Sequence, residues 1–486
     1  MRPSLQLQPA RARRALSISP RSGPASAAPF ALQSLAGASS SLASALRAIG
    51  ALLLPVAALL AAAPAGAQSL REFYDSALAS DPVYAAARAQ AQSVREREPQ
   101  AFAALLPNLG FTAGIQAYSL DANVRGPSSH SDSTRNWTLQ LSQPLFRWQN
   151  YVGWQQAKLA VAASEATLLQ AQQDLRLRLT RAYLDVLAAE DTVAFVRAKK
   201  AAIAEQLASA KRNFEVGTAT ITDTNEAQAR YDLAIAEELG AENDVATRRT
   251  ALLQVSGRLP GELVPLRAPV TLAAPDPASI DDWVAAAEAD NPQVQAAGIN
   301  AEIAMREIER ARAGHLPTVD VVASRNYQSN IQTYAISGIP NTSLRTDSIG
   351  LQLSVPLFAG GGTQARVRET VSLDEQARQN TENARRQAAQ TARQTYLGVT
   401  TGLAQVRALE TAEKSSQSAL DSNLLGYKVG VRVNIDVLNA QQQLFSTRRD
   451  LAKARYDAIY TGLQLKAAAG RLGDDELVAT DGLFGR

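Results

Sequence analysis

The sequence predicts a mixed, mainly α-helical protein: long antiparallel coiled-coil helices plus four β-strands, with the whole arrangement written twice along the chain. Three observations predict it. The second half of the chain repeats the first at a nearly constant offset. A helical apolar pattern is sustained for about 65 residues in each half. Before each helical pattern, two short stretches alternate apolar and polar side chains, as strands do.

The composition excludes several classes of protein. Of the 486 residues, 46% are hydrophobic and 20% are charged, which fits neither a disordered nor a collagen-like chain. The absence of cysteine excludes disulfides, Cys-ligated metals and thiol nucleophiles. Six of the 49 basic residues and none of the 46 acidic residues lie in the first 67 positions, so the remainder is slightly acidic. The composition therefore gives no support for a nucleic-acid partner.

The first 67 residues are typical of a secretory signal. Arg47 precedes a run of 16 small and apolar residues, 48–63, and the segment ends in Ala65-Gly66-Ala67, a small-x-small cleavage pattern. A membrane anchor is the alternative, but 16 residues fall short of the roughly 20 that a spanning helix needs. We expect cleavage after Ala67.

The duplication fixes the domain organisation. Pro82 recurs as Pro292 at an offset of 210, and Pro144-Leu145-Phe146 recurs as Pro356-Leu357-Phe358 at 212. Gly257-Arg258-Leu259 recurs as Gly470-Arg471-Leu472 at 213. We predict a first repeat over 68–262, a Pro-rich connector over 263–279, a second repeat over 280–475 and a tail over 476–486.

Each repeat opens with a short helical pattern, over 70–103 and 280–313, and continues with two strands of roughly 10 to 13 residues. Leu106-Pro107 and Leu316-Pro317 stand where the alternation starts. The links 121–135 and 331–346 are rich in polar and turn-forming residues, which predicts long hairpin loops. A soluble β-sandwich remains an alternative for these strands, but it leaves the long helices unexplained.

The long helical patterns cover 148–215 and 364–428. In the first, we followed two series of every seventh residue, one starting at Leu168 and one at Gln172. Twelve of these fourteen positions are apolar, which indicates a coiled-coil seam. Their counterparts in the second repeat are more polar. At 1.5 Å per residue, each helix would extend about 100 Å. Val216-Gly217 and Val429-Gly430 predict the turns after which each helix runs back.

Four strands with an apolar face cannot close a barrel within one chain. The smallest membrane barrels use about 8 strands, and hydrocarbon does not tolerate open strand edges. Two chains would give 8 strands with a filled interior, and three would give 12 with room for a lumen. The polar inner faces favour the trimeric, 12-stranded transmembrane barrel.

At this point the chain resembles the TolC family of outer-membrane channels. The resemblance rests on the duplicated strand-strand-helix-turn-helix order, on the Leu-Pro strand openings, and on the turn motifs at 214–223 and 426–440. It implies a homotrimer in the cell outer membrane, surrounded by outer-membrane lipid, with an α-helical barrel extending into the periplasm. It also implies a passive exit duct that works with a periplasmic adaptor (membrane fusion protein) and an inner-membrane ABC or proton-driven transporter, in type I protein secretion or small-molecule efflux. A coiled-coil adhesin anchored in the outer membrane is the alternative.

The resemblance also implies gating residues at the helix turns. Thr222 and Asp223 of the first turn would face Tyr427 and Arg432 of the second. Asp436 would point into the lumen, where threefold symmetry makes a ring of three carboxylates that attracts cations. The family has an acidic residue where this chain has Asn439. Spacing alone also allows Asp223 and Asp436 to be helix caps. We expect the adaptor to contact the turn residues: Val216, Gly217, Thr218, Val429, Gly430 and Val431.

Features that suggest an enzyme are weak. Gly360-Gly361-Gly362-Thr363 lacks the Lys of a phosphate-binding loop and is expected to form the bend between strand and helix. His130 is expected in a solvated loop and His315 at an interface. No arrangement of side chains fits a nucleophile and its base, so we expect no catalytic residues, cofactor or resident metal.

Overall fold

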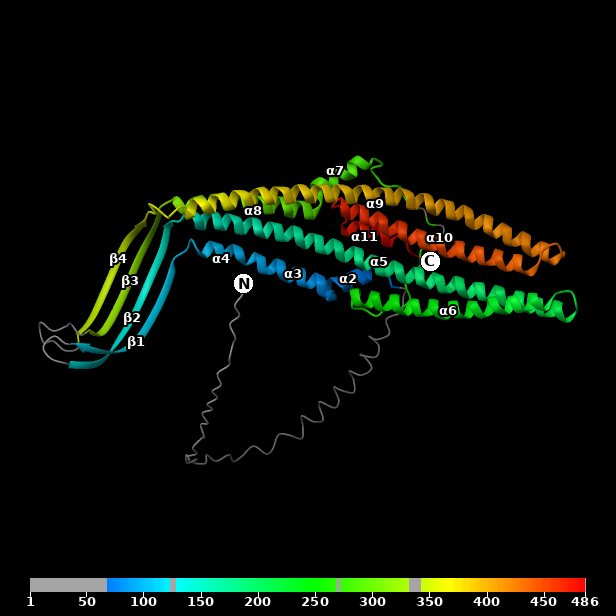
Figure 1. Ribbon diagram of the computed structural model, residues 1–486, viewed down its shortest axis with the longest axis horizontal. Coiled ribbons are helices and arrows are strands. Elements are labelled where there is room, and N and C mark those ends of the chain that lie inside the picture. Colours follow the sequence, from blue (N-terminus) through cyan, green and yellow to red (C-terminus); the bar gives the residue numbers. More distant parts are fainter. Residues whose placement is uncertain (1–67, 123–127, 268–269, 271, 332–341, 486) are drawn as a thin grey trace, which may run out of the picture. The chain divides into compact units, whose positions relative to one another are not determined.

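The structure is a computed structural model that describes residues 68–485, except 123–127, 268–269, 271 and 332–341. The predicted signal, 1–67, lies outside the described residues. The first repeat contains three short helices, two strands and a long helical hairpin (Figure 1). These elements are α2 (Leu70–Ser80), α3 (Pro82–Arg95), α4 (Arg97–Ala103), β1 (Asn108–Ala122), β2 (Ser128–Phe146), α5 (Trp148–Glu215) and α6 (Ile221–Ser256).

The second repeat follows the same order. It contains α7 (Ile280–Asp290), α8 (Pro292–Arg312), the 3-10 turn η1 (Ala313–His315), β3 (Thr318–Ile331), β4 (Thr342–Ser354), α9 (Gly362–Lys428) and α10 (Asn434–Ala468). A last helix, α11 (Asp474–Asp481), ends the chain. The predicted fold class and internal duplication are therefore confirmed.

The long helices lie where the periodicity predicts them. Helix α5 spans 68 residues with the predicted bounds, and α9 spans 67 and begins two residues before the predicted start. Eight of the fourteen predicted seam residues of α5 are buried, whereas the buried residues of α9 are mostly Ala and Thr. None of the described helices combines the length and apolar character that a membrane span requires.

The short helical segments are broken, which the helical pattern did not predict. Pro82 and Pro292 each occupy the first turn of a new helix, where a missing N–H costs nothing. The preceding side chain caps that helix: Asp81 accepts a hydrogen bond from the Tyr84 N–H (2.7 Å), and Asn291 accepts one from the Gln293 N–H (2.9 Å). The expected segment 70–103 is therefore three helices, and 280–313 is two helices and a 3-10 turn.

The breaks between α2 and α3 and between α7 and α8 form two corners, and a glycine from the return helix of the same repeat packs against each of them. Gly257 ends α6, and Gly470 follows the C-cap of α10; both are left-handed, with φ of 65° and 71°. A Cβ on Gly257 would lie 2.4 Å from the Ser80 hydroxyl, and one on Gly470 would lie 2.3 Å from the Asp290 carbonyl. The repeated Gly-Arg-Leu motif therefore marks the place where each return helix packs against the corner of its own repeat.

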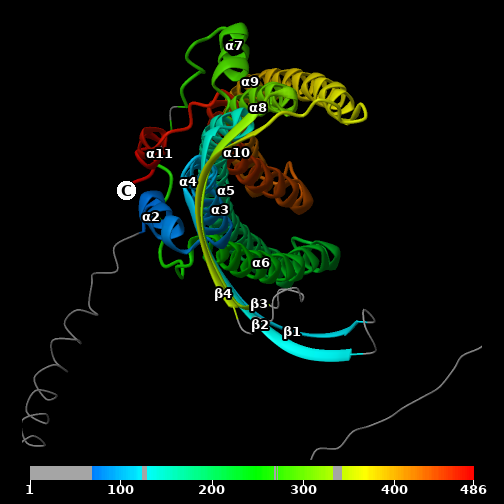
Figure 2. The same cartoon turned by 90° about the vertical axis from the view of Figure 1, so that its left-hand side faces the viewer.

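The four strands form one antiparallel sheet in the order β1-β2-β3-β4, which is curved (Figure 2). No second sheet packs on it within the described residues, so the β-sandwich alternative is wrong. No helix covers it either (Figure 1), and the edge strands are exposed on both faces over 108–117 of β1, except at Gly110, and over 343–354 of β4. An ion pair between Arg147 and Asp320, at 2.6 Å, ties the start of α5 to β3.

Three of the four strands are longer than the predicted length of roughly 10 to 13 residues. The four strands contain 15, 19, 14 and 13 residues, and pairing continues to Ala122↔Ser128 in the first hairpin and to Ile331↔Thr342 in the second. The predicted loops 121–135 and 331–346 are thus partly strand, and position 130 lies in β2. Ser and Thr at these positions suggested loops, but a ladder needs only backbone groups and continues beyond the apolar face.

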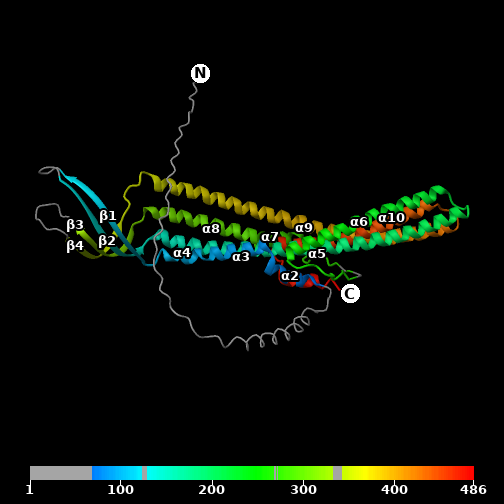
Figure 3. The ribbon, with the colours of Figure 1, turned by 90° about the horizontal axis from the view of Figure 1, so that it is seen from below.

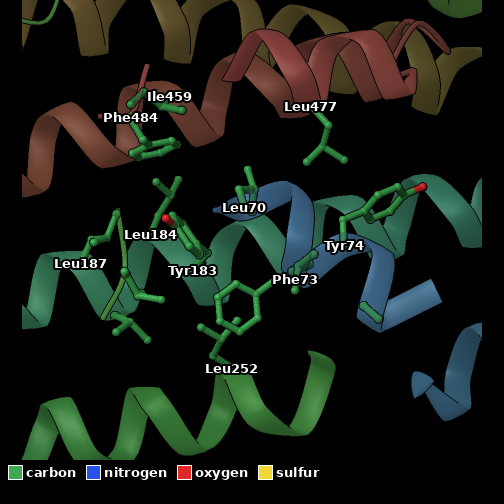
Figure 4. Packing of buried hydrophobic residues seen from close by; sticks show 14 of the residues in the cluster. Leu70, Phe73, Tyr74, Tyr183, Leu184, Leu187, Leu252, Ile459, Leu477 and Phe484 are labelled. Carbon is green, nitrogen blue, oxygen red and sulfur yellow. The ribbon is translucent and has the colours of Figure 1, made fainter. Parts of the chain in front are cut away.

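The largest core joins the two repeats about halfway along the long helices. Tyr183 of α5 contacts Phe73 of α2 and Phe484 near the C-terminus, with ring centroids 5.9 and 5.4 Å apart (Figure 4). Its hydroxyl donates to the carbonyls of Gln68 and Val264. Helices α2, α7 and α11 lie at this level (Figure 1), and Figure 3 shows α2 and α7 from below. The start of the predicted connector is therefore part of the core.

Candidate functional site: the tips of the two hairpins

The two hairpins end in the same turn. The Gly217 N–H donates to Phe214 O and the Thr218 N–H to Asn213 O, at 3.0 and 2.8 Å. In the second hairpin, Gly430 and Val431 donate to Tyr427 O and Gly426 O, at 3.2 and 2.9 Å. This is the Schellman pattern, in which a left-handed residue satisfies the last carbonyls of a helix. Gly217 (φ 78°) and Gly430 (φ 80°) supply that residue.

The return helices begin differently, although their sequences are repeats. In α6 the Thr220 hydroxyl accepts from the Asp223 N–H (3.2 Å), and the Asp223 carboxylate accepts from the Thr220 N–H (3.0 Å). This capping box satisfies two amide groups. In α10 the N-cap is Val433, which has no side-chain acceptor. Asp223 is therefore a cap, one of the two roles that its spacing allowed, whereas Asp436 is free for another role.

Asp436 pairs with Arg432, one turn earlier. Their closest atoms, Arg432 Nη1 and Asp436 Oδ2, are 3.5 Å apart, and the two side chains are 59% and 34% exposed. Gly426 makes room for this arginine, because a Cβ there would lie 2.7 Å from Arg432 Cγ. An exposed pair at this distance is weak, so both charges remain accessible to a partner or an ion.

Near the tips, polar contacts at three places join one hairpin to the other. The Asn213 side chain donates to the Tyr427 hydroxyl (3.1 Å), and Arg230 of α6 donates to Asn439 of α10 (3.2 Å). The third contact runs through Asn434. This side chain is 2% exposed, accepts from Gln206 of α5 and donates to the backbone carbonyl of Asp223 (3.3 Å). It thus links α5, α6 and α10.

The predicted gating residues are brought together in part. Arg432 meets Asp436, and Tyr427 and Asn439 each contact the first hairpin. In the described part of this single chain, no hydrogen bond joins Thr222 or the Asp223 side chain to Tyr427 or Arg432, so that pairing stays a prediction for contacts between chains. Sequence reasoning missed Gln206, Asn213, Arg230 and Asn434. The available signal for Asn434 was its position between the apolar Val433 and Ile435.

The residues expected to contact an adaptor form an exposed apolar tip. Val216, Val429 and Val431 are 72%, 65% and 76% exposed. Apart from the adjacent residues, no described atom lies within 4 Å of a Cβ built on Gly217 or Gly430. A concentration of exposed valines at two neighbouring turns is typical of a protein-contact surface.

Of the features that suggested enzyme chemistry, the glycine run has a structural role. Gly360 and Gly361 have φ of 59° and 80° and shape the bend before α9. His315 is exposed in η1. Among residues whose placement is described, no group of three His, Cys, Asp or Glu side chains could hold a metal ion.

The comparisons with known proteins agree with this arrangement. Residues 73–258 and 283–471 match the family "Outer membrane efflux protein". The chain is 32% identical over 415 residues to outer membrane protein TolC of Vibrio cholerae, covering 85% of this chain and 93% of that protein. It is 31% identical to the alkaline protease secretion protein AprF of Pseudomonas aeruginosa, covering 86% and 88%.

Solved structures show the same fold. The outer membrane protein VceC of Vibrio cholerae superimposes with a TM-score of 0.69 at 20% identity, covering 82% of this chain and 96% of VceC. The resemblance to TolC found in the turn motifs is therefore confirmed over most of the chain. The chain belongs to the outer membrane efflux protein family, and it is a TolC-like, passive channel protein of the cell outer membrane, not an enzyme.

Proposed function

We propose that this protein is the homotrimeric exit duct of a tripartite export system. Its substrates would be passed on by an inner-membrane ABC or proton-driven transporter and a periplasmic adaptor. Three chains would contribute four strands each to a 12-stranded barrel in the outer membrane. The helical hairpins would form a second barrel in the periplasm and close the duct at their tips.

The observation that carries this proposal is the uncovered sheet. Both of its edges are open, β1 and β4 are exposed on both faces, and Leu109, Ile115 and Ile349 are 65%, 74% and 80% exposed. An edge exposed to hydrocarbon leaves backbone groups without partners, at several kcal/mol each. Pairing β4 of one copy with β1 of the next removes both edges and leaves the apolar side chains facing lipid.

The closed state would depend on the polar contacts at the tips. Asn213–Tyr427, Arg230–Asn439 and the Asn434 link hold the two hairpins of one chain together. Asp436, which has no capping role, would face the lumen with its two symmetry mates and bind cations. The exposed valines of the tips would contact the adaptor. Names of relatives support both kinds of cargo: AprF is an alkaline protease secretion protein, and BepC of Brucella suis is an outer membrane efflux protein.

Conductance in planar bilayers tests the proposal. The wild type should give small, cation-preferring steps, and Arg432→Ala with Asp436→Ala should give larger ones, because the contacts predicted between Arg432 and the Thr222–Asp223 turn of a neighbouring chain are lost. Asp436→Ala alone should weaken block by trivalent cations. Asp450→Ala, which removes an exposed acidic residue further along α10, is the control and should leave block unchanged. A double variant that never conducts would contradict the channel, and unchanged block in Asp436→Ala would remove Asp436 from the lumen.

A further inference from the structure

The apolar face of the sheet changes character along its length. Strand register places Leu109, Leu141, Ala323 and Ile349 in one row across the four strands, followed by the row Phe111, Leu139, Arg325 and Asp347. The next row contains Ala113, Trp137, Tyr327 and Arg345. Successive rows on one face are about 6.7 Å apart. The face therefore passes from aliphatic to aromatic and charged within about two rows.

Aromatic rings mark this boundary. The centroids of Phe111 and Trp137 are 6.2 Å apart, and those of Trp137 and Tyr327 are 6.0 Å apart with nearly parallel planes. Aromatic rows of this kind stand at the interface between hydrocarbon and headgroups in outer-membrane barrels. The row thus places one edge of the apolar band at Trp137 and Tyr327.

Three arginines surround the aromatic row; together with Asp347 they are called the arginine cluster below. Arg345 stacks on Tyr327, with its guanidinium carbon 5.6 Å from the ring centroid. Arg325 pairs with Asp347 at 3.0 Å, and Arg135 lies one row further out, opposite Ser329. All three arginines are exposed. Among the described residues, neither Arg135 nor Arg345 has a carboxylate partner, so the cluster carries a net charge of about +2.

The cluster lies in the part of the sheet away from the long helices, and the first hairpin continues beyond it to Ala122 and Ser128. The opposite end of β2 leads into α5, and that of β4 leads into α9. On the proposed function, which places those helices in the periplasm, the cluster is at the outer leaflet. The lipid of that leaflet carries phosphate groups directly above its acyl chains. Arginine binds phosphate through paired N–H groups, and stacking on a ring leaves those groups free at its edge.

We propose that Arg135, Arg325 and Arg345 form a binding site for the phosphates of lipid A, the phosphorylated glycolipid of the outer leaflet, while Trp137 and Tyr327 pack against its acyl chains. Charge complementarity selects this occupant: an uncharged lipid would gain nothing from three cations. Each trimer would carry three such sites, one on the outer surface of each four-stranded segment. The lipid would thereby fix the depth of the barrel in the membrane.

Lipid binding to the full-length trimer, measured by native mass spectrometry, tests this site. The probes are bisphosphorylated lipid A and the same lipid after removal of both phosphates. The wild type should bind the bisphosphorylated form at least about tenfold more tightly. The variant Arg135→Gln, Arg325→Gln, Arg345→Gln should lose that preference. The matched control, Arg386→Gln, Arg393→Gln, Arg407→Gln, removes the same charge from the exposed surface of α9 and should keep it.

Two results would overturn the site: equal binding of both lipids by the wild type, or an unchanged preference in the strand variant. If the strand variant falls apart into monomers without lipid, the arginines contact the neighbouring copy and the proposal is also wrong. Conductance of the same samples separates this inference from the proposed function. A wild type that conducts but ignores phosphate contradicts only the lipid site.

Discussion

At the scale of single residues, two carboxylates at equivalent positions of the two repeats make different contacts. Asp223 and Asp436 are separated by the repeat offset of 213, yet one closes a capping box and the other pairs with Arg432. The difference comes from the N-cap, which is Thr220 in one case and Val433 in the other. The identity of the N-cap residue therefore separates a carboxylate that is engaged in a capping box from one that is not.

Val433→Thr should convert Asp436 into a cap. The hydroxyl would satisfy the first turn of α10, which is worth about 1 kcal/mol, and the carboxylate would turn back toward its own backbone. We expect block by trivalent cations to weaken in planar bilayers, as in Asp436→Ala, while the resistance of the trimer to heat rises slightly. Thr220→Val is the reciprocal control and should lower heat resistance without affecting block. Full block in Val433→Thr would show that the cap does not compete for Asp436.

Asp191 gives a pH-dependent prediction. It accepts a hydrogen bond from the Tyr456 hydroxyl (2.7 Å) beside a cavity of about 300 Å³. Burial raises the pKa of its carboxyl, helped by nearby Glu190 and opposed by Tyr456 and Arg455. With a raised pKa, the folded protein binds the Asp191 proton more tightly than the unfolded chain does. The ionised Asp191 carboxylate therefore lowers the stability of the fold at neutral pH. This destabilisation disappears as the pH falls through the raised pKa.

Asp191→Asn should therefore raise the temperature of trimer dissociation at pH 7.5, and the gain should shrink toward pH 5. The amide keeps an acceptor for Tyr456, so the hydrogen bond survives. Dissociation temperatures read on SDS gels over this pH range are the measurement. Asp421→Asn removes the same charge from an exposed site on α9 and controls for net charge. A gain that is equal at all pH values would contradict a raised pKa.

At the scale of elements, the periodicity of the sequence was enough to predict the long helices. Apolar residues that repeat every seven positions over so long a stretch have no other structural explanation. The periodicity was not enough to predict the short helices. Pro82 and Pro292 were visible as repeat markers, but their role as first-turn residues depends on caps at Asp81 and Asn291 and on contacts with distant return helices. Strand ends were also missed, because pairing between backbones extends into Ser-rich sequence that has no apolar pattern.

The candidate site was predictable only in outline. The turn motifs located the tips and singled out Arg432 and Asp436, which do meet. The contacts of Gln206 and Asn213 could not be predicted, because they join hairpins that are more than 200 residues apart in sequence. Local spacing carries no information about which face of α5 lies toward α10.

A comparison of the corner glycine Gly470 with the tip glycine Gly430 predicts how tightly α10 packs against the α7–α8 corner. Gly470 and Gly430 both have positive φ, but only Gly470 is crowded, with the Asp290 carbonyl 2.3 Å from a built Cβ. Gly430→Ala should cost about 1 to 2 kcal/mol, from its backbone conformation alone. Gly470→Ala should cost about 1 to 3 kcal/mol more, since the α7–α8 corner must move away from α10. Dissociation temperatures of the two variants measure the difference, and equal losses would show that this corner is not tightly packed.

At the scale of the whole molecule, the account depends on the incompleteness of one chain. Four strands with two open edges, an apolar face and no covering layer are a third of the barrel that we propose. The helical hairpins also look incomplete in a single chain. Helix α9 buries mainly small residues and leaves Leu397 and Leu425 56% and 64% exposed. Neighbouring copies would cover these surfaces.

The number of chains in the membrane-inserted particle is the most direct test. Protein extracted from outer membranes into mild detergent would be weighed by light scattering, with the detergent contribution subtracted by refractive index. The account predicts three copies per particle, which resist SDS until heated and conduct when reconstituted. A single copy that inserts and conducts by itself, or a stable pair, would contradict it.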